Sequence, residues 1–411
     1  MRLTFNMQFA QSLNGILNTQ KKMSVAENQL TKQTRILSPA DDPAASAKVL
    51  GLDQNLAQIE QFQKNSVLLK NNLALEETVL SGMRGTLDRI STLALASGNG
   101  TYGPRERASV AFELRNIQTE LLDLMNTRGA DGGFIFSGFQ DRVAPYTFNN
   151  VSGRYEFTGD DGFKALQVSP SITLPGNDSG RGIFDNVFAR FKPSAVTVTS
   201  GVPDSVSINV TEQSRFDAFY LAAYDSVNPA NNTFNIVLDA GGTYEVLQNG
   251  SALTPPVSGP FVPGEAFRFN GLRVEINGEA AAPGQIDFVL PPPEKKNILN
   301  TIEDFIAALQ DPTINAEDFA ERISDTLVQV ANSADSISAA MSNIGGRVNV
   351  LDSVFENNED LKINNQTYKA DLSEVDFAAA LTEIKRQEVA LQAVSSTFAK
   401  ISATTLFDFI R

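Results

Sequence analysis

The side chains that could carry out chemistry in this sequence of 411 residues are of few kinds, because it contains no His and no Cys. Carboxylates, Ser with Lys, and Tyr remain as candidate acids, bases or nucleophiles. Adjacent carboxylates could suggest acid–base or glycosidase chemistry, at Asp41 and Asp42, Glu76 and Glu77, Asp160 and Asp161, and Glu303 and Asp304. Neighbouring residues on a helix or strand point in different directions, so caps, turns and solvated faces explain these pairs better. We therefore expect a protein that is not an enzyme.

Binding sites for metals, phosphates and nucleic acids are equally poorly supported. Without His or Cys there is no disulfide and no His or Cys metal site, and we expect no cofactor. The glycine-rich run at Gly176, Gly180 and Gly182 is not followed by a helix with a phosphate-binding Lys, so it predicts a loop. The formal net charge is -15, the pI is near 4.6 and no basic face is clustered, which argues against a nucleic-acid partner.

The sequence gives little indication of a signal peptide or of a membrane-spanning segment. The N-terminal stretch MRLTFNMQFAQSLNG has no apolar core and no small-residue cleavage site, so it predicts no signal peptide. No apolar stretch reaches membrane-spanning length, and we expect no membrane insertion. The default expectation is the cytosol, unless a signal-independent route carries the chain out.

The elements that would position any functional residue are helices at both ends of the chain. Apolar residues recur there every three or four positions, which is typical of helices with one apolar stripe. The N-terminal stripe contains Leu13, Ile16, Met23, Leu30 and Leu37, and the C-terminal stripe contains Phe377, Leu381, Ile384, Leu391, Val394, Phe398 and Ile401. We expect the two ends to meet in a coiled coil. Gln20, Glu27, Thr34 and Glu388 dilute the stripes, which leaves two interpretations open: a coiled coil within a monomer, or an assembly seam that neighbouring subunits complete.

Further helices are predicted next to these ends. The first helix should stop near Leu37, since Ser38 precedes Pro39 and residues before proline avoid the helical region. Asp42 is then the expected cap of a long helix that starts at Pro43 and runs to about residue 97. Pro104 opens a second helix, antiparallel to the first. Helical spacing resumes from about residue 299 into the C-terminal stripe, with a turn or kink expected at Gly345 and Gly346.

Between the helical regions the period changes to alternation, with frequent turns, which predicts a β-rich segment. Hairpins are expected around residues 159–162, around Gly241 and Gly242, and at Asn270 and Gly271. The sequence thus predicts an α+β protein with a long helical core and an inserted β-rich domain. Its expected parts are a terminal helical region of residues 1–37 and 372–411, a helical core of 38–145 and 294–371, and a β-rich domain of 146–293.

Several stretches, in order, resemble the flagellin superfamily, and within it the family of hook-filament junction proteins. SLNGILNTQKKMSVAENQLTKQTRILSPADDPAAS is similar to the N-terminal signature, and GGFIFSGFQDRVAPY to the stretch that leaves the helical core. FNGLRVEINGEAAAPGQIDFVLP resembles a hairpin motif of the superfamily, and ALQAVSSTFAKISATTLFDFIR closes like a junction protein. The motif of Ser38, Pro39, Asp41, Asp42 and Pro43 differs from the Lys-Asp-Asp version usual in flagellins. Residues 184–263 match no family motif.

The resemblance implies an extracellular structural protein of the bacterial flagellum, exported unfolded through the flagellar type III channel without a cleaved signal peptide. It implies a ring of copies of the chain between hook-associated protein 1 and the flagellin filament, with an export chaperone and the export apparatus as further partners. The terminal stripes would form the assembly seam. The alternatives are a flagellin-type filament subunit and a surface adhesin that displays the β-rich domain.

Overall fold

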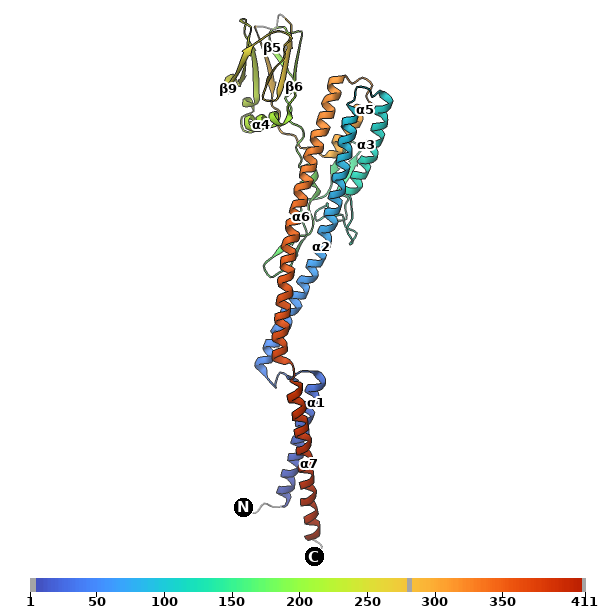
Figure 1. Ribbon diagram of the computed structural model, residues 1–411, viewed down its shortest axis with the longest axis vertical. Helices are drawn as coiled ribbons and strands as arrows, with labels where there is room; N and C mark the ends of the chain where they lie inside the picture. Colours follow the sequence, from blue (N-terminus) through green and yellow to red (C-terminus); the bar gives the residue numbers. More distant parts are fainter. Residues whose placement is uncertain (1–4, 279–282, 409–411) are drawn as a thin grey trace. The chain divides into compact units, whose positions relative to one another are not determined.

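The computed structural model of the chain describes residues 5–278 and 283–408, except for the side chains of residues 5, 6, 8 and 401–408. Long helices at both ends of the sequence flank a β-rich middle, so the predicted α+β class is confirmed (Figure 1). The chain divides into two compact units, one of Met1–Asn71, Ala165–Leu174 and Arg347–Arg411, the other of Asn72–Lys164 and Pro175–Gly346. The three regions expected from the sequence stay a prediction.

The first unit is built from antiparallel helices. α1 (Phe5–Lys32) lies beside α7 (Phe377–Asp408), so the two ends of the chain meet as expected (Figure 1). The first part of α2 (Pro43–Ser97) pairs with the last part of α6 (Ala316–Ser373). Ion pairs link them, from Lys369 to Asp53 at 2.6 Å and from Lys70 to Asp352 at 2.7 Å. The α2 residue nearer the N-terminus pairs with the α6 residue nearer the C-terminus, as antiparallel helices require.

A joint separates these two pairs. α1 ends at Lys32 rather than near Leu37, because Gln33 has a φ of 54°, in the left-handed region that a helix cannot contain. The chain then makes a short bridge between Thr34 and Glu374. On the other side α6 ends at Ser373 and α7 begins at Phe377, so the C-terminal stripe expected as one helix from residue 372 starts later.

Of the turn or kink expected at Gly345 and Gly346, the turn is wrong, because α6 continues through both residues, and the kink stays a prediction. The flanking side chains of Ile344 and Leu351 are buried, and packing of the neighbouring turns holds the helix despite the low helix propensity of glycine. By contrast, the predicted long helix from Pro43 to Ser97 is confirmed, without interruption.

The second unit contains the rest of the helical core. α3 (Pro104–Met125) runs antiparallel to α2, with Nη2 of Arg89 2.6 Å from Oε1 of Glu113, which confirms the predicted helix hairpin. α5 (Ile298–Gln310) packs against α3. The buried amide of Gln118 donates to the carbonyl oxygen of Leu299 at 3.0 Å and joins the two helices.

Two small hairpins follow α3 in the sequence. β1 (Tyr146–Asn149) pairs with β2 (Arg154–Phe157), and β3 (Ala165–Gln167) pairs with β4 (Thr173–Pro175). The expected hairpin around residues 159–162 is therefore wrong. Asp160 instead accepts hydrogen bonds from the backbone N–H groups of Phe139 and Gly162, so this stretch folds back on the preceding loop rather than pairing two strands.

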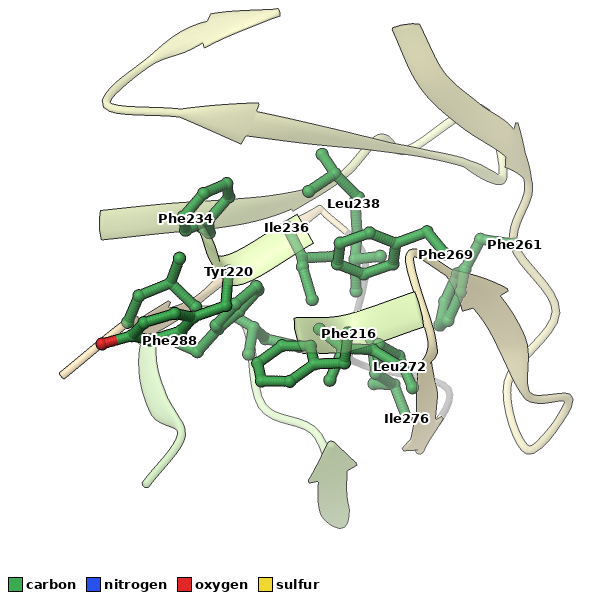
Figure 2. Packing of buried hydrophobic residues seen from close by; sticks show 14 residues of the cluster. Phe216, Tyr220, Phe234, Ile236, Leu238, Phe261, Phe269, Leu272, Ile276 and Phe288 are labelled. Atoms are coloured by element: carbon green, nitrogen blue, oxygen red, sulfur yellow. The ribbon is translucent and has the colours of Figure 1, made fainter. Parts of the chain in front are cut away.

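The larger β region has two antiparallel sheets that share one core. The five-stranded sheet has the order β5 (Thr197–Ser200), β12 (Gly284–Val289), β7 (Thr233–Leu238), β8 (Thr243–Gln248) and β9 (Ser251–Pro260). The three-stranded sheet has the order β10 (Phe267–Phe269), β11 (Leu272–Asn277) and β6 (Ser205–Val210). Alternating side chains of β7, β11 and β12 point inward, as period-two strands require, and they meet Phe216 and Tyr220 of α4 (Gln213–Ala223) (Figure 2). We call the region from Arg190 to Pro292 the sandwich.

Two hairpins of the sandwich agree with the sequence. β7 and β8 join at Gly241 and Gly242, and β10 and β11 join at Asn270 and Gly271. Asn270 has a φ of 46° and Gly271 a φ of 84°, the pair of left-handed conformations that a tight hairpin turn needs. α4 was not expected, because its eleven residues lie in a stretch dominated by strand signals. The four-residue spacing of Phe216 and Tyr220 was the signal that could have found it.

Candidate functional site

Carboxylates of the adjacent acidic pairs have structural roles. Asp160 holds backbone N–H groups of a loop, and Asp304 forms ion pairs with Arg154, at 2.6 Å, and with Lys296. Within residues 5–278 and 283–408, no three Asp or Glu side chains come together in a group that could hold a metal ion. In the same part of the chain no helix is both long and apolar enough to cross a membrane. The terminal helices are the other part of the chain in which the sequence predicts functional residues.

The α1–α7 pair brings the two predicted stripes together. The rings of Phe9 and Phe398 lie 5.0 Å apart, centroid to centroid. Further along, a Cβ atom built at Gly15 would lie 3.7 Å from Cγ1 of Val394, so the backbone of α1 approaches α7 closely there. These contacts join residues early in α1 to residues late in α7, which sets the antiparallel register of the pair.

Most of the predicted seam residues reach this interface but are not enclosed by it. The half-buried members are Ile16, Met23, Leu30, Ile384, Leu391, Val394 and Phe398, whereas Leu37, also half-buried, lies in the loop after α1. Leu13, Phe377 and Leu381 remain 42%, 55% and 56% exposed. Ile401 lies in α7, but its side chain is outside the described residues. Among the described residues of the pair, Ala26, Ala380 and Gln387 are the ones that become buried. The helices thus leave much apolar surface open.

The motif after α1 builds the start of α2. The carboxylate of Asp42 accepts a hydrogen bond from the backbone N–H of Ala45 at 3.0 Å, which is the geometry of the predicted helix cap. This bond, with the nearby guanidinium of Arg35, holds the pKa of Asp42 below its usual value. Asp41 accepts from the N–H groups of Leu37 and Ser38 at 3.0 and 2.8 Å. Ser38 and Pro39 lie in this loop, and Pro43 is the first helical residue.

The joint contains functional side chains that sequence reasoning missed. The guanidinium of Arg35 donates to the carbonyl oxygen of Leu372 at 3.0 Å and to Asp42 at 3.2 Å, and its backbone N–H donates to Ser373 at 2.7 Å. Arg35 therefore ties the loop before α2 to the end of α6. Asp376 caps α7 by accepting from the N–H of Ala378 at 2.9 Å. An Asp just before a helical stretch was the available signal for the second break.

Comparison with known proteins relates the N-terminal helical part of the chain to a known family. Residues 4–141 match the bacterial flagellin N-terminal helical region. Flagellar hook-associated protein 3 of Salmonella typhimurium is 29% identical over 193 residues, and that of Escherichia coli is 30% identical over 187 residues. These matches cover 47% and 46% of this chain and 60% and 58% of the relatives. The chain therefore aligns with less than two thirds of the length of these curated relatives.

A solved structure extends the likeness over nearly the whole length of the related protein. The flagellar junction protein FlgL from Legionella pneumophila matches with a TM-score of 0.57 and 25% identity, over 79% of this chain and 99% of that one. The sequence matches cover nearly half of the chain, and the structural match extends the similarity of fold to most of it. The chain therefore contains a match to the flagellin N-terminal helical region and is similar to flagellar hook-associated protein 3.

Proposed function

We propose that this chain forms the junction between the hook and the filament of a bacterial flagellum. A ring of its copies would connect hook-associated protein 1 with the flagellin filament, on the outside of the cell. The proposal rests on the similarity to flagellar hook-associated protein 3 and on the incomplete burial of the terminal helix pair. The activity is assembly, and the acidic residues Asp42, Asp160 and Asp304 have cap, turn and ion-pair roles.

The observation that carries the proposal is the open apolar surface of α1 and α7. Phe377 and Leu381 occupy stripe positions yet remain 55% and 56% exposed. Further apolar side chains of the same pair, Met7, Leu17, Val25 and Val389, are also exposed. Large exposed apolar side chains on one helix pair are what an interface with neighbouring subunits would need. Neighbouring subunits that dock their own terminal helices on this surface would complete its burial.

The energetics of the pair favour coupling between folding and assembly. Ordering one residue costs roughly 1 to 2 kcal/mol of backbone entropy, and each side chain that stays half-exposed returns only part of its transfer free energy. The pair therefore gains little stability within one chain. We infer that the terminal helices become fully ordered when neighbouring subunits cover them, which also protects the free chain from premature polymerisation.

The partners follow from this position in the flagellum. Hook-associated protein 1 would contact one side of the ring and flagellin the other, and the copies of this chain would contact one another. An export chaperone would cover the terminal helices before secretion through the flagellar type III apparatus, since the same apolar stripes need protection inside the cell.

Electron microscopy of a deletion strain tests the proposed function. The junction role predicts short or absent filaments, with flagellin monomer leaking into the medium. Immunolabelling of the complemented strain should give a single band at the base of the filament. Label along the whole filament would instead identify a flagellin-type subunit, and normal filaments in the deletion strain would identify a surface adhesin.

A further inference from the structure

The sandwich contains a polar cleft that the junction role does not use. The cleft has a volume of about 590 Å³ and lies where the end of α4 meets the turn between β8 and β9. Its walls also include part of the 3-10 helix η2 (Pro229–Asn232). Its lining includes the aromatic or polar side chains of Tyr224, Asp225, Asn231, Gln248 and Asn249.

Tyr224 ends a stack of three parallel aromatic rings. Phe191 and Tyr220 lie 4.2 Å apart with an interplanar angle of 6°, and Tyr220 and Tyr224 lie 5.3 Å apart, again at 6°. Tyr224 is the last ring of this row and lines the cleft, while the phenol of Tyr220 is anchored on the carbonyl oxygen of Pro291 at 2.5 Å. A ring supported in this way is a rigid, pre-organised platform for a flat apolar face.

The polar walls of the cleft are also held in place. Asp225 accepts hydrogen bonds from the backbone N–H of Asn228 at 2.9 Å, from the side-chain amide of Asn231 at 2.8 Å and from the backbone N–H of Val227 at 2.8 Å, and these bonds hold its pKa below the usual value. The amide of Gln248 donates to the carbonyl oxygens of Ala223 and Asn231. Oε1 of Gln248 and Oδ1 of Asn249 have no hydrogen-bond donor among the described residues, so these acceptors remain available.

The charged residues in the lining limit the classes of ligand that the cleft can bind. No Lys or Arg lines the cleft, and Asp225 is its one acidic residue. A phosphate or carboxylate would therefore meet repulsion and no counter-charge. Hydroxyl groups, in contrast, would find a carboxylate and amide oxygens as acceptors and the hydroxyls of Ser226 and Ser251 as further partners.

Two large apolar residues that are adjacent in sequence to the cleft lining are exposed. Leu221 is 71% exposed and Val227 is 81% exposed. Each is next in sequence to a residue that lines the cleft, Ala222 or Ser226.

We propose that this cleft binds a neutral saccharide, with a sugar ring stacked on Tyr224. Asp225 and the amide oxygens of Gln248 and Asn249 accept hydrogen bonds from its hydroxyls. Such a site would lie within residues 184–263, which match no family motif. It would work independently of the terminal helices.

Saturation-transfer NMR and calorimetry with the full chain test this site. The probes are the methyl glycosides of glucose, galactose, mannose and N-acetylglucosamine. At least one should bind, and Tyr224→Ala should weaken it about tenfold, the order expected for one aromatic contact. Since Tyr224→Ala removes a ring that packs on Tyr220, a second variant is needed that deletes no contact. Ala252 is exposed and lines the cleft, so Ala252→Trp should fill the cleft and abolish binding with an unchanged circular dichroism spectrum.

Tyr368→Ala is the matched control, because Tyr368 is an exposed tyrosine, 46% accessible, in α6. It should leave the affinity unchanged. The proposal is overturned if none of the four glycosides binds at millimolar concentration, or if Ala252→Trp binds as well as the original chain. Competition for the cleft by a peptide library without any sugar binding would also overturn it, in favour of a protein ligand.

Discussion

Two aspartates of this chain have pKa values shifted in opposite directions. Asp42 is solvated and caps α2, and the N–H group of Ala45 favours its charged form. Asp185 lies in the one-turn helix η1 (Arg181–Asp185), where burial raises its pKa although Asn297 and Tyr146 donate to it at 2.5 and 3.2 Å. The first carboxylate stabilises the fold when it is ionised, whereas the second is easier to bury when it is protonated.

The cap is tested with Asp42→Ala. This variant should accelerate hydrogen exchange at Ala45 several-fold and lower the melting temperature, because the first turn of α2 loses the acceptor for its N–H groups. Asp42→Asn keeps a capping oxygen and is the control that should behave almost like the original chain. Asp41→Ala should loosen the loop at Leu37 and Ser38 and leave exchange at Ala45 nearly unchanged. Faster exchange at Ala45 in Asp41→Ala than in Asp42→Ala would refute the assignment of the cap.

The buried carboxyl is tested through the pH dependence of stability. A folded-state pKa above the unfolded value means that the folded chain holds more protons between the two pKa values, so Asp185 lowers stability as the pH rises through that window. Asp185→Asn keeps an acceptor for Tyr146 and Asn297 but has no charge. Its free energy of unfolding relative to the original chain should increase as the pH is raised above the ordinary pKa of 3.8. A constant difference from pH 3 to 8, measured by urea denaturation, would contradict this account.

At the scale of the elements, continuous periodic stretches and two tight hairpin turns could be predicted, whereas the breaks at the joint of the terminal helices could not. The stretch from Pro43 to Ser97 indicated one helix because one heptad position is apolar from Leu52 to Ala94, apart from Ser66, with no slip in register. The joint at Gln33 depends on bonds from Arg35 to Leu372 and Ser373, which are distant in sequence, so local propensity carries no trace of it. The seam residues could be selected by period alone. Only the structure shows how little of the seam is buried within one chain.

The sandwich is the element that should fold by itself. Its core is made of side chains from both sheets and α4, and Phe191 at its start and Pro291 at its end both contact Tyr220. A fragment of residues 190–292 should therefore be soluble and β-rich by circular dichroism, with a cooperative unfolding transition. Phe288→Ala in this fragment should cost about 3 to 5 kcal/mol, since the ring is buried against Phe234.

The longer fragment of residues 146–293, which follows the boundary predicted from the sequence, provides the comparison. Its first part depends on helices that the fragment lacks, because the side chain of Asn126 bonds both N and O of Tyr146, and Asn300 bonds both N and O of Tyr155. This fragment should contain the same sandwich with an unfolded N-terminal extension. If 190–292 is unfolded and 146–293 is folded, the boundary at Arg190 is wrong.

At the scale of the whole molecule, stability and function lie in different places. Buried cores occur in the sandwich and along the helices of the second unit, with Leu87, Leu114 and Ile302 among the enclosed side chains. The terminal pair buries little and exposes apolar stripes. We infer that the free chain holds its fold through its cores, and that assembly supplies the burial which the terminal pair lacks.

Phe398→Asp measures this separation most directly. Phe398 lies on the stripe, half-buried and in contact with Phe9, and an unpaired charge there would be dehydrated once neighbouring helices cover the pair. The purified chain should melt within a few degrees of the original, while a strain that carries the variant should fail to incorporate it and should lose motility. Ser396→Asp adds the same charge at an exposed position of α7 and should assemble normally.

The decisive result is the pair of values for Phe398→Asp: the melting temperature of the free chain and the amount incorporated at the base of the filament. A nearly unchanged melting temperature with incorporation lost is the outcome expected of a seam completed by neighbouring subunits. A melting temperature lowered by many degrees, with amides from Leu381 onward already protected in the free original chain, would show that the stripe is an intramolecular core and would contradict the assembly account.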